Sequence, residues 1–202
     1  MTGIWTKIWE WVDRIFTWPV MVYRKWKYGY TFRRIYLGEG EYTIVDQNDY
    51  YKYGGIRWSL GGDKKKYYAV AGIKDVNGEL IIQRLHRLIA NAPKGILVDH
   101  HNGKSLDNRS ENLRLATRAQ NNCNKSKQKN ASSKYMGAHF HKLHKKWIAQ
   151  LSHNNKHIFL GYFDNEIDAA KAYDAAAKKY HRIFARLNFP DISAVSPLEK
   201  SA

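Results

Sequence analysis

Cysteine is nearly absent from this chain of 202 residues, which contains only Cys123. A single cysteine excludes a disulfide within the chain and a zinc site built on a pair of cysteines. Long apolar runs are missing too, because no stretch approaches the ~20 residues of a membrane-spanning helix, and no signal peptide is apparent. We therefore expect a protein of a reducing interior compartment, without a transmembrane segment.

Acidic residues are scarce as well. Lys and Arg number 34 against 18 Asp and Glu, a formal net charge of +16, and residues 112–163 contain ten basic residues and no acidic one. This balance favours a polyanionic partner, with nucleic acid first and an anionic membrane surface second. The chain is 44% hydrophobic, with 14 Tyr and 7 Trp, which is enough for one or two small domains with real cores.

Residues 1–34 form a Trp-rich segment. Its apolar residues recur at spacings of three and four, as on one face of an amphipathic helix: Ile4, Trp5, Ile8, Trp9, Val12, Ile15 and Phe16. Trp18-Pro19 is expected to end this helix. We expect the apolar stripe to pack on the rest of the protein or on a second copy. An interfacial membrane helix is the alternative, since Trp is abundant, although the polar face is not strongly basic.

Residues 35–83 are predicted to be rich in strands. The strands are expected at residues 41–45, 56–60, 67–73 and 79–83. Two turn signals separate them, Gly61-Gly62-Asp63 and Asn77-Gly78, and the latter is typical of a two-residue hairpin.

Residues 98–124 predict a strand, a polar loop, a second strand and a helix in this order. The first strand ends at Asp99, His100 and His101, the loop occupies residues 102–109, and residues 113–116 alternate as a second strand does. Thr117 and Gln120 fit a capping box that opens the helix. Four side chains are thereby able to converge: Asp99, His100, Asn112 and Asn121. Three other asparagines are interpreted as turn formers or caps: Asn102, Asn108 and Asn122.

This stretch resembles the HNH nuclease motif, the ββα-metal fold, in the form found in phage and intron-borne homing endonucleases. The matching residues are LHRLIA (85–90), VDHHNG (98–103), NL (112–113) and QNN (120–122). The resemblance implies a metal-dependent DNA endonuclease, located in the cytoplasm of a bacterial or phage-infected cell or inside an organelle. It also implies that residues 35–83 form a sheet that braces the ββα unit.

The same resemblance assigns a role to each converging side chain. His100 is the expected general base, because an imidazole can take a proton from water near neutral pH, and Asn112 holds its ring. Asp99 and the side-chain oxygen of Asn121 are expected to bind Mg²⁺, or another divalent cation such as Mn²⁺, which neutralises the phosphate and the leaving oxygen. His101 offers a rival imidazole where the family more often has an apolar residue. His86 matches the family without a chemical role.

A basic linker, residues 125–133, leads to a second module at residues 134–190. Three strands are expected there, at residues 135–141, 147–152 and 157–163. Asp164 can cap a helix with an apolar stripe facing the sheet, formed by Ile167, Ala170, Tyr173, Ala177 and Tyr180. The predicted fold class is therefore α+β, in which a ββα nuclease domain precedes a three-stranded antiparallel sheet packed on one helix.

The second module resembles the DNA-binding domain of plant ethylene-response factors, the Apetala-type domain. The residues that carry the likeness are KYMGA (134–138), KWIAQL (146–151), IFLGYFD (158–164), EIDAAKAYDAAA (166–177) and ARLNFP (185–190). In that family the sheet lies in the major groove. The implied contact positions are Met136, His139, His141, Gln150, Ser152, His157 and Phe159, with Lys142, Lys145, Lys146 and Lys156 for phosphates. Five of these positions lack the Arg that the family usually has, which weakens guanine readout.

We therefore interpret the chain as a DNA endonuclease of the HNH homing type. Residues 35–124 would cut double-stranded DNA, residues 134–190 would hold it in register, and residues 191–202 form a tail. No small-molecule substrate is expected. Two alternatives stay open: a DNA-binding or regulatory protein with an inactive HNH domain, and a membrane- or partner-associated protein that uses residues 1–34. One ββα unit has one active site, so a monomer should nick, and cutting both strands needs a dimer or a second visit.

Overall fold

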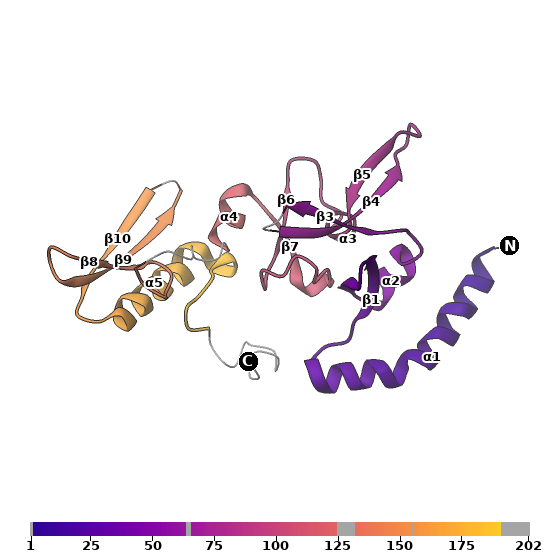
Figure 1. Cartoon of the computed structure of the whole chain (residues 1–202), viewed down its shortest axis with the longest axis horizontal. Coiled ribbons are helices and arrows are strands. Elements are labelled where there is room, and N and C mark those ends of the chain that lie inside the picture. Colours follow the sequence, from indigo (N-terminus) through magenta and orange to yellow (C-terminus); the bar gives the residue numbers. More distant parts are fainter. Residues whose placement is uncertain (1, 64–65, 125–131, 155, 191–202) are drawn as a thin grey trace. The chain divides into compact units, whose positions relative to one another are not determined.

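The computed structural model describes residues 2–63, 66–124, 132–154 and 156–190 (Figure 1). Residues 125–131 of the predicted linker and the predicted tail lie outside the described residues. The described chain forms two compact units, one of residues 2–93 and 104–114 and the other of residues 94–103 and 115–190. Helices and small sheets occur in both, which confirms the α+β class. The domain limits at 35–124 and 134–190 stay predictions.

The first unit contains two small antiparallel sheets. One pairs β1 (Arg33–Gly38) with β2 (Glu41–Val45), and the other, in the order β3-β4-β5, contains β3 (Ser59–Asp63), β4 (Lys66–Lys74) and β5 (Leu80–Arg84). Two short helices, α2 (Gln47–Tyr53) and α3 (Leu85–Ile89), and the 3-10 turn η1 (Ser110–Asn112) complete it together with the long helix described below. Its core is formed by Ile35, Leu37, Val45, Tyr53, Trp58, Ala69, Ala71 and Leu85.

The strand predicted at residues 56–60 begins only at Ser59. Trp58 is buried, and its indole nitrogen donates a hydrogen bond to the carbonyl oxygen of Tyr53 at 2.9 Å. This hydrogen bond keeps residues 56–58 close to the end of α2 and out of the sheet. The prediction that these residues belong to a strand was therefore wrong. The strand at residues 41–45 is found as predicted, and the other two differ only at their ends.

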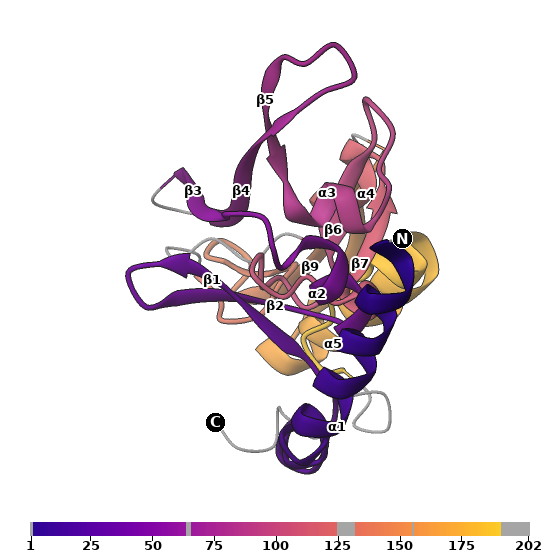
Figure 2. The ribbon, with the colours of Figure 1, turned by 90° about the vertical axis from the view of Figure 1, so that its right-hand side faces the viewer.

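The first helix, α1 (Thr2–Tyr28), runs well past the predicted end at Trp18-Pro19 (Figure 2). Pro19 removes one backbone donor, but the following turns are held by the buried Met21 and by the Arg24 side chain, which donates to the carbonyl oxygen of Phe32. The helix ends instead at Gly29, whose φ of 76° and bond to Lys25 O at 2.9 Å form a glycine C-terminal cap. Among the described helices, none is long and apolar enough to cross a membrane.

The second unit contains β6 (Leu97–His100), which pairs with β7 (Leu113–Ala116), the last two residues of β7, and α4 (Arg118–Cys123). A three-stranded antiparallel sheet follows, in the order β10-β9-β8, formed by β8 (Ala138–His141), β9 (Lys146–His153) and β10 (Lys156–Phe163). The helix α5 (Glu166–His181), followed by the 3-10 turn η2 (Arg182–Phe184), packs on one face of this sheet (Figure 1). The predicted sheet on one helix is confirmed.

Three details of this module differ from the predictions. Asn165, not Asp164, caps α5, because its side-chain oxygen accepts from Asp168 N at 2.8 Å while Asp164 pairs with Lys146. Ile167 is exposed, so the buried stripe of the helix begins at Ala169 and Ala170.

The first strand of the sheet begins after Gly137 instead of at residue 135. The φ of Gly137 is +70°, and the buried ring of Tyr173 lies only 1.9 Å from where a Cβ would stand, so the chain turns here, and extended strand geometry begins at Ala138. The same burial raises the pKa of Tyr173 to about 12.

Candidate active site

The predicted order of strand, loop, strand and helix is present at residues 97–123. Asp99 and His100 form the end of β6, where they are 4% and 1% exposed. The capping box at the start of α4 is confirmed, since the Thr117 hydroxyl accepts from Gln120 N at 3.3 Å and the Gln120 side chain accepts from Thr117 N at 2.8 Å. A carboxylate and an imidazole are thus adjacent on one buried strand, followed in the chain by a short, well-capped helix.

The α4 helix is tied to β6 by Asn124, a residue that the sequence interpretation did not single out. Its side-chain nitrogen lies 3.1 Å from each carboxylate oxygen of Asp99, 2.8 Å from the carbonyl oxygen of His100 and 3.4 Å from that of His101. Asn124 is the C-cap of α4 and is buried. One amide therefore contacts the carboxylate and the strand backbone around it.

Asn121 is half-buried on α4, three residues before Asn124. Residues three apart lie near one another on a helix surface, and approach of the Asn121 side chain to Asp99 stays a prediction. Among the described residues, no group of three or more His, Cys, Asp or Glu could hold a metal ion. An Asp carboxylate with an Asn amide oxygen is a different donor set, of the hard oxygen ligands that suit Mg²⁺. Because a carboxylate offers about four acceptor sites, its bond to Asn124 is compatible with that role.

Asn112 belongs to the first unit, where it is buried in η1. Its side-chain nitrogen donates to the carbonyl oxygen of Asp107 at 2.7 Å, and its backbone nitrogen donates to Arg109 O at 2.9 Å. These bonds fix the side chain at the end of the loop. Contact between Asn112 and the His100 ring, which the family resemblance implies, stays a prediction.

The loop before Asn112 is docked on β2 by buried polar groups. Asn108 is fully buried, donates from its side chain to the Thr43 hydroxyl at 2.8 Å, and bonds through its backbone nitrogen to Ile44 O, also at 2.8 Å. The interpretation of Asn108 as a turn former was therefore wrong. Asp107 and Arg109 form a buried ion pair at 2.8 Å. Burial opposes the charge on Arg109, but its bonds to Asp107 outweigh that effect and raise its pKa.

The two other histidines of the motif differ in their surroundings. His101 is exposed, in the turn directly after β6. His86 is buried in α3, with its ring centroid 5.0 Å from that of Tyr68. This packing supports a structural role for His86, and the exposure of His101 makes it a useful comparison with His100.

The implied DNA-contacting residues on the strands of the second module share the face of the sheet opposite α5, whereas Met136 packs against the core that includes Leu151 and Tyr173. His157 is paired with Ser152 and Phe159 with Gln150 in the β9–β10 register, and all four are exposed. Ala149 and Leu151 alternate with them and are buried toward α5. His139, His141 and Lys146 are half-buried on the same sheet, Lys142 is exposed in the following turn, and Met136 is half-buried before β8.

Tyr162 joins this face although simple alternation along β10 would exclude it. The register shifts between Phe159 and Gly161, and the bulge brings Tyr162 to the same side as Phe159, with ring centroids 5.2 Å apart. His144 adds a further ring, stacked on His141 at 4.7 Å. The exposed face thus presents aromatic and imidazole rings beside lysines, a combination suited to nucleic acid.

Comparison with known proteins adds two findings. A family model described as HNH endonuclease matches residues 84–123, a segment that contains Asp99, His100, Asn112 and Asn121 but not Asn124. Two rice proteins named APETALA2-like protein 2, from Oryza sativa subsp. indica and subsp. japonica, are each 41% identical to this chain over 64 residues. The alignment covers 31% of this chain and 14% of each relative, so the chain spans about a seventh of the length of the relatives it matches. The HNH match supports a nuclease or DNA-binding function.

Proposed function

We propose that this chain is a metal-dependent DNA endonuclease of the HNH homing type. The observation that supports this most is the pairing of Asp99 and His100 on β6, inside the segment that matches the HNH model, with α4 held against that strand by Asn124. Hydrolysis of a phosphodiester needs a base, a cation and fixed geometry, and each has a candidate here.

In this proposal His100 takes a proton from the attacking water, and Asn112 keeps the imidazole in its working orientation. Asp99 and Asn121 hold Mg²⁺ or Mn²⁺, which when bound neutralises charge on the phosphate and on the leaving 3′ oxygen. His100 is 1% exposed in the unbound chain. The contact between base and water would thus form in the complex with DNA, as catalytic hydrogen bonds often do.

The face of the β8–β10 sheet opposite α5 is the proposed DNA-binding surface. Phe159, His157 and Gln150 lie side by side on it, and Lys142 and Lys146 flank it. Lysines position a protein on phosphates, whereas exposed rings and amides reach the bases. We infer DNA binding with a modest sequence preference, because none of the implied contact positions in the sheet carries Arg.

The test measures cleavage of supercoiled plasmids that carry a diverse library of DNA inserts, in the presence of Mg²⁺. Wild type should convert the supercoiled plasmid to open-circular or linear product, and His100→Ala should not, while both shift DNA equally in gels. His101→Ala is the matched control, because it removes the neighbouring exposed imidazole, and it should keep its activity. If neither wild type nor the variants cut while all bind DNA, the nuclease proposal fails and a binding or regulatory protein with an inactive HNH domain remains.

A further inference from the structure

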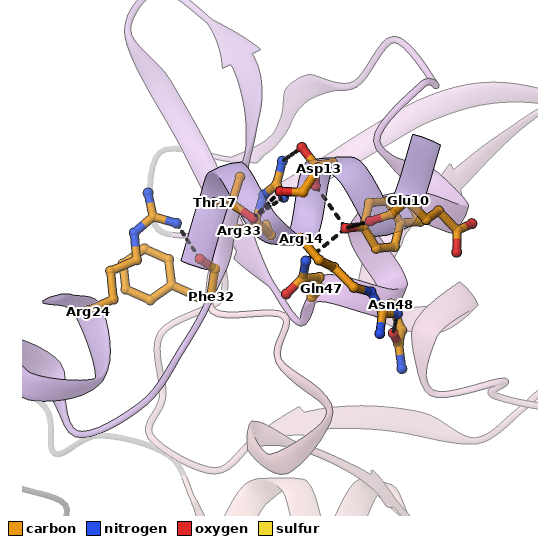
Figure 3. Close-up of polar contacts among 10 residues, drawn as sticks. Glu10, Asp13, Arg14, Thr17, Arg24, Phe32, Arg33, Gln47 and Asn48 are labelled. Atoms are coloured by element: carbon orange, nitrogen blue, oxygen red, sulfur yellow. Dashed lines mark hydrogen bonds and ion pairs between the residues drawn. The ribbon is translucent and has the colours of Figure 1, made fainter. Parts of the chain in front are cut away.

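The polar side of the α1 helix contacts β1 and α2 of the same unit (Figure 3). Asp13 forms an ion pair with Arg33 on β1 at 2.5 Å and accepts a hydrogen bond from the Tyr51 hydroxyl on α2 at 2.8 Å. Arg14 donates to the side chain of Asn48 at 3.2 Å. These bonds, with the buried Met21, fix the helix on β1 and α2 without using its apolar stripe.

The apolar stripe faces outward instead. Ten large apolar side chains of α1 are exposed and are here called the outer face: Ile8, Trp9, Trp11, Ile15, Phe16, Trp18, Val20, Val22, Tyr23 and Trp26. Phe16 and Trp26 are 78% and 80% exposed. Packing of this stripe on the rest of the protein, one of the two expected arrangements, is therefore not what the described residues show.

The spacing of the outer face is that of a helix–helix seam. Ile8, Trp11, Ile15, Trp18 and Val22 follow one another at alternating intervals of three and four residues, which is the a/d pattern of a heptad repeat. Ile or Val occupies every a position, as in two-stranded coiled coils, whereas the d positions carry Trp11 and Trp18 where such coils usually have Leu. A second row, Trp9, Phe16 and Tyr23, recurs at intervals of seven residues at the b positions, about a third of a turn away from the seam. The polar side of α1 carries Glu10 and Asp13 beside Arg14 instead of the Lys- and Arg-rich face that interfacial membrane helices have, so a second helix suits this stripe better than a lipid surface.

The area of the outer face is also that of a protein interface. A fully exposed aromatic side chain offers about 200 Å², so the ten partly exposed side chains together offer roughly 1,000 Å². Large exposed patches on monomers reach only about 300–600 Å². The five seam side chains offer roughly half of this area, so two seams in contact would bury roughly 1,000 Å², the lower limit for a specific interface.

We propose that the outer face of α1 is a dimerisation surface for a second copy of this chain. A two-fold dimer uses the same patch on both subunits, and this patch is a single continuous helix face that can meet its own copy. The surface is preformed, because the bonds of Asp13 and Arg14 already hold the helix on its own body.

The dimer would supply a second HNH site, and this consequence rests on the proposed nuclease function. One site cuts one strand, so a dimer acting on one DNA could cut both strands in a single encounter. Wild type should then give linear plasmid, and a dimer-deficient variant should accumulate open circles.

Sedimentation velocity of the full chain without DNA tests the dimer independently of cleavage. Wild type should sediment at twice the mass of the 23.6 kDa chain, and Trp11→Glu/Trp18→Glu should sediment as a monomer. Both tryptophans are about two-thirds exposed, so the variant should keep the circular dichroism and melting of wild type. Val76→Glu/Ile82→Glu is the matched control, since it places the same charges on exposed apolar positions of the β4–β5 hairpin and should remain dimeric.

The proposal is overturned if wild type is a monomer at about 100 µM, or if Trp11→Glu/Trp18→Glu stays a dimer. Flotation of monomeric wild type with phosphatidylglycerol vesicles that persists at high salt and is lost in Trp11→Glu/Trp18→Glu would assign the outer face to a membrane surface instead. Flotation that high salt abolishes would report only the net positive charge of the chain. The His100→Ala variant should dimerise like wild type, so failure of the nuclease proposal and failure of the dimer are separate outcomes.

Discussion

Replacing Asn124 should weaken both the fold and the cation site, because its amide contacts the Asp99 carboxylate and the strand that carries it. A hydrogen bond to a charged group contributes about 1.5–3 kcal/mol to stability. Asp99 is only 4% exposed, so water cannot easily replace the donor that the substitution removes. Asn124→Ala should therefore lower the free energy of unfolding by about 2–4 kcal/mol. That corresponds to a fall in melting temperature of roughly 5–15 °C.

Asn124→Asp is the more severe change although it is nearly isosteric. It places a second carboxylate where the amide nitrogen now lies, 3.1 Å from both oxygens of Asp99. At an effective dielectric constant of about 20, two charges at this distance repel by about 5 kcal/mol. The Asp variant should thus melt below the Ala variant in EDTA. Mg²⁺ should raise its melting temperature more than that of wild type, because the cation offsets the repulsion.

Thermal unfolding and Mg²⁺ titration of plasmid nicking measure the two effects separately. Asn122→Ala is the matched control, since Asn122 is an exposed residue of the same type on the same helix. If Asn124 orients Asp99 for a cation, Asn124→Ala should need about 10–100-fold more Mg²⁺ for half-maximal nicking. Equal melting of Asn124→Ala and Asn122→Ala would refute the stabilising role of the amide. Equal Mg²⁺ dependence would refute its role in holding the carboxylate.

Three further predictions concern other parts of the molecule. Hydrogen bonding to Arg33 lowers the pKa of Asp13 below its ordinary 3.8, so the stability that this contact contributes is present above the pKa of the unfolded state and is lost as pH falls through the pKa of the folded state. The Trp fluorescence of α1 should therefore change in that pH range in wild type but not in Asp13→Asn. Identical titrations of the two proteins would contradict this. Lys142→Gln should lower DNA affinity and reduce the slope of log K against log salt by about 1, whereas an unchanged slope would remove Lys142 from the phosphate contacts. Gly137→Ala should destabilise by at least about 2 kcal/mol through a positive φ and a ring in the place of its Cβ, while Gly55→Ala, with open space around it, should not; equal calorimetric melting of the two would contradict the argument.

Most of the strands, the helices α4 and α5 and the HNH elements were accessible from the sequence because local patterns determine them, whereas β1 and α2 were not predicted. The capping box at Thr117 and Gln120 needs only four consecutive residues, and the amphipathic α5 needs only its own periodicity. Ends of elements were less accessible. Trp58 lies outside the strand that was predicted to contain it, because its indole nitrogen donates a hydrogen bond to the carbonyl oxygen of Tyr53. No local sequence pattern predicts such a contact.

The candidate site shows the same division. Asp99 and His100 follow from their place at the end of a strand, but Asn124 is recognisable only when the α4 helix lies against that strand. Its one sequence signal is the spacing of three residues after Asn121, which places both on one helix face. Tyr162 was missed because a bulge shifts the alternation of β10 by one residue, and alternation alone cannot locate a bulge.

The α1 helix shows that a hydrophobic period predicts which residues share one face of a helix but not whether that face points toward the protein core or toward solvent. The period establishes which residues share a face, and here that inference holds, because the exposed side chains of α1 include the expected Ile8, Trp9, Ile15 and Phe16. It does not establish which way the face points. That direction depends on the polar side, where Asp13 finds Arg33 and Tyr51 on elements far along the chain. An exposed apolar area of this size marks an interaction site. The heptad spacing of Ile8, Trp11 and Ile15 is the basis of the proposal that a second copy of the helix covers it.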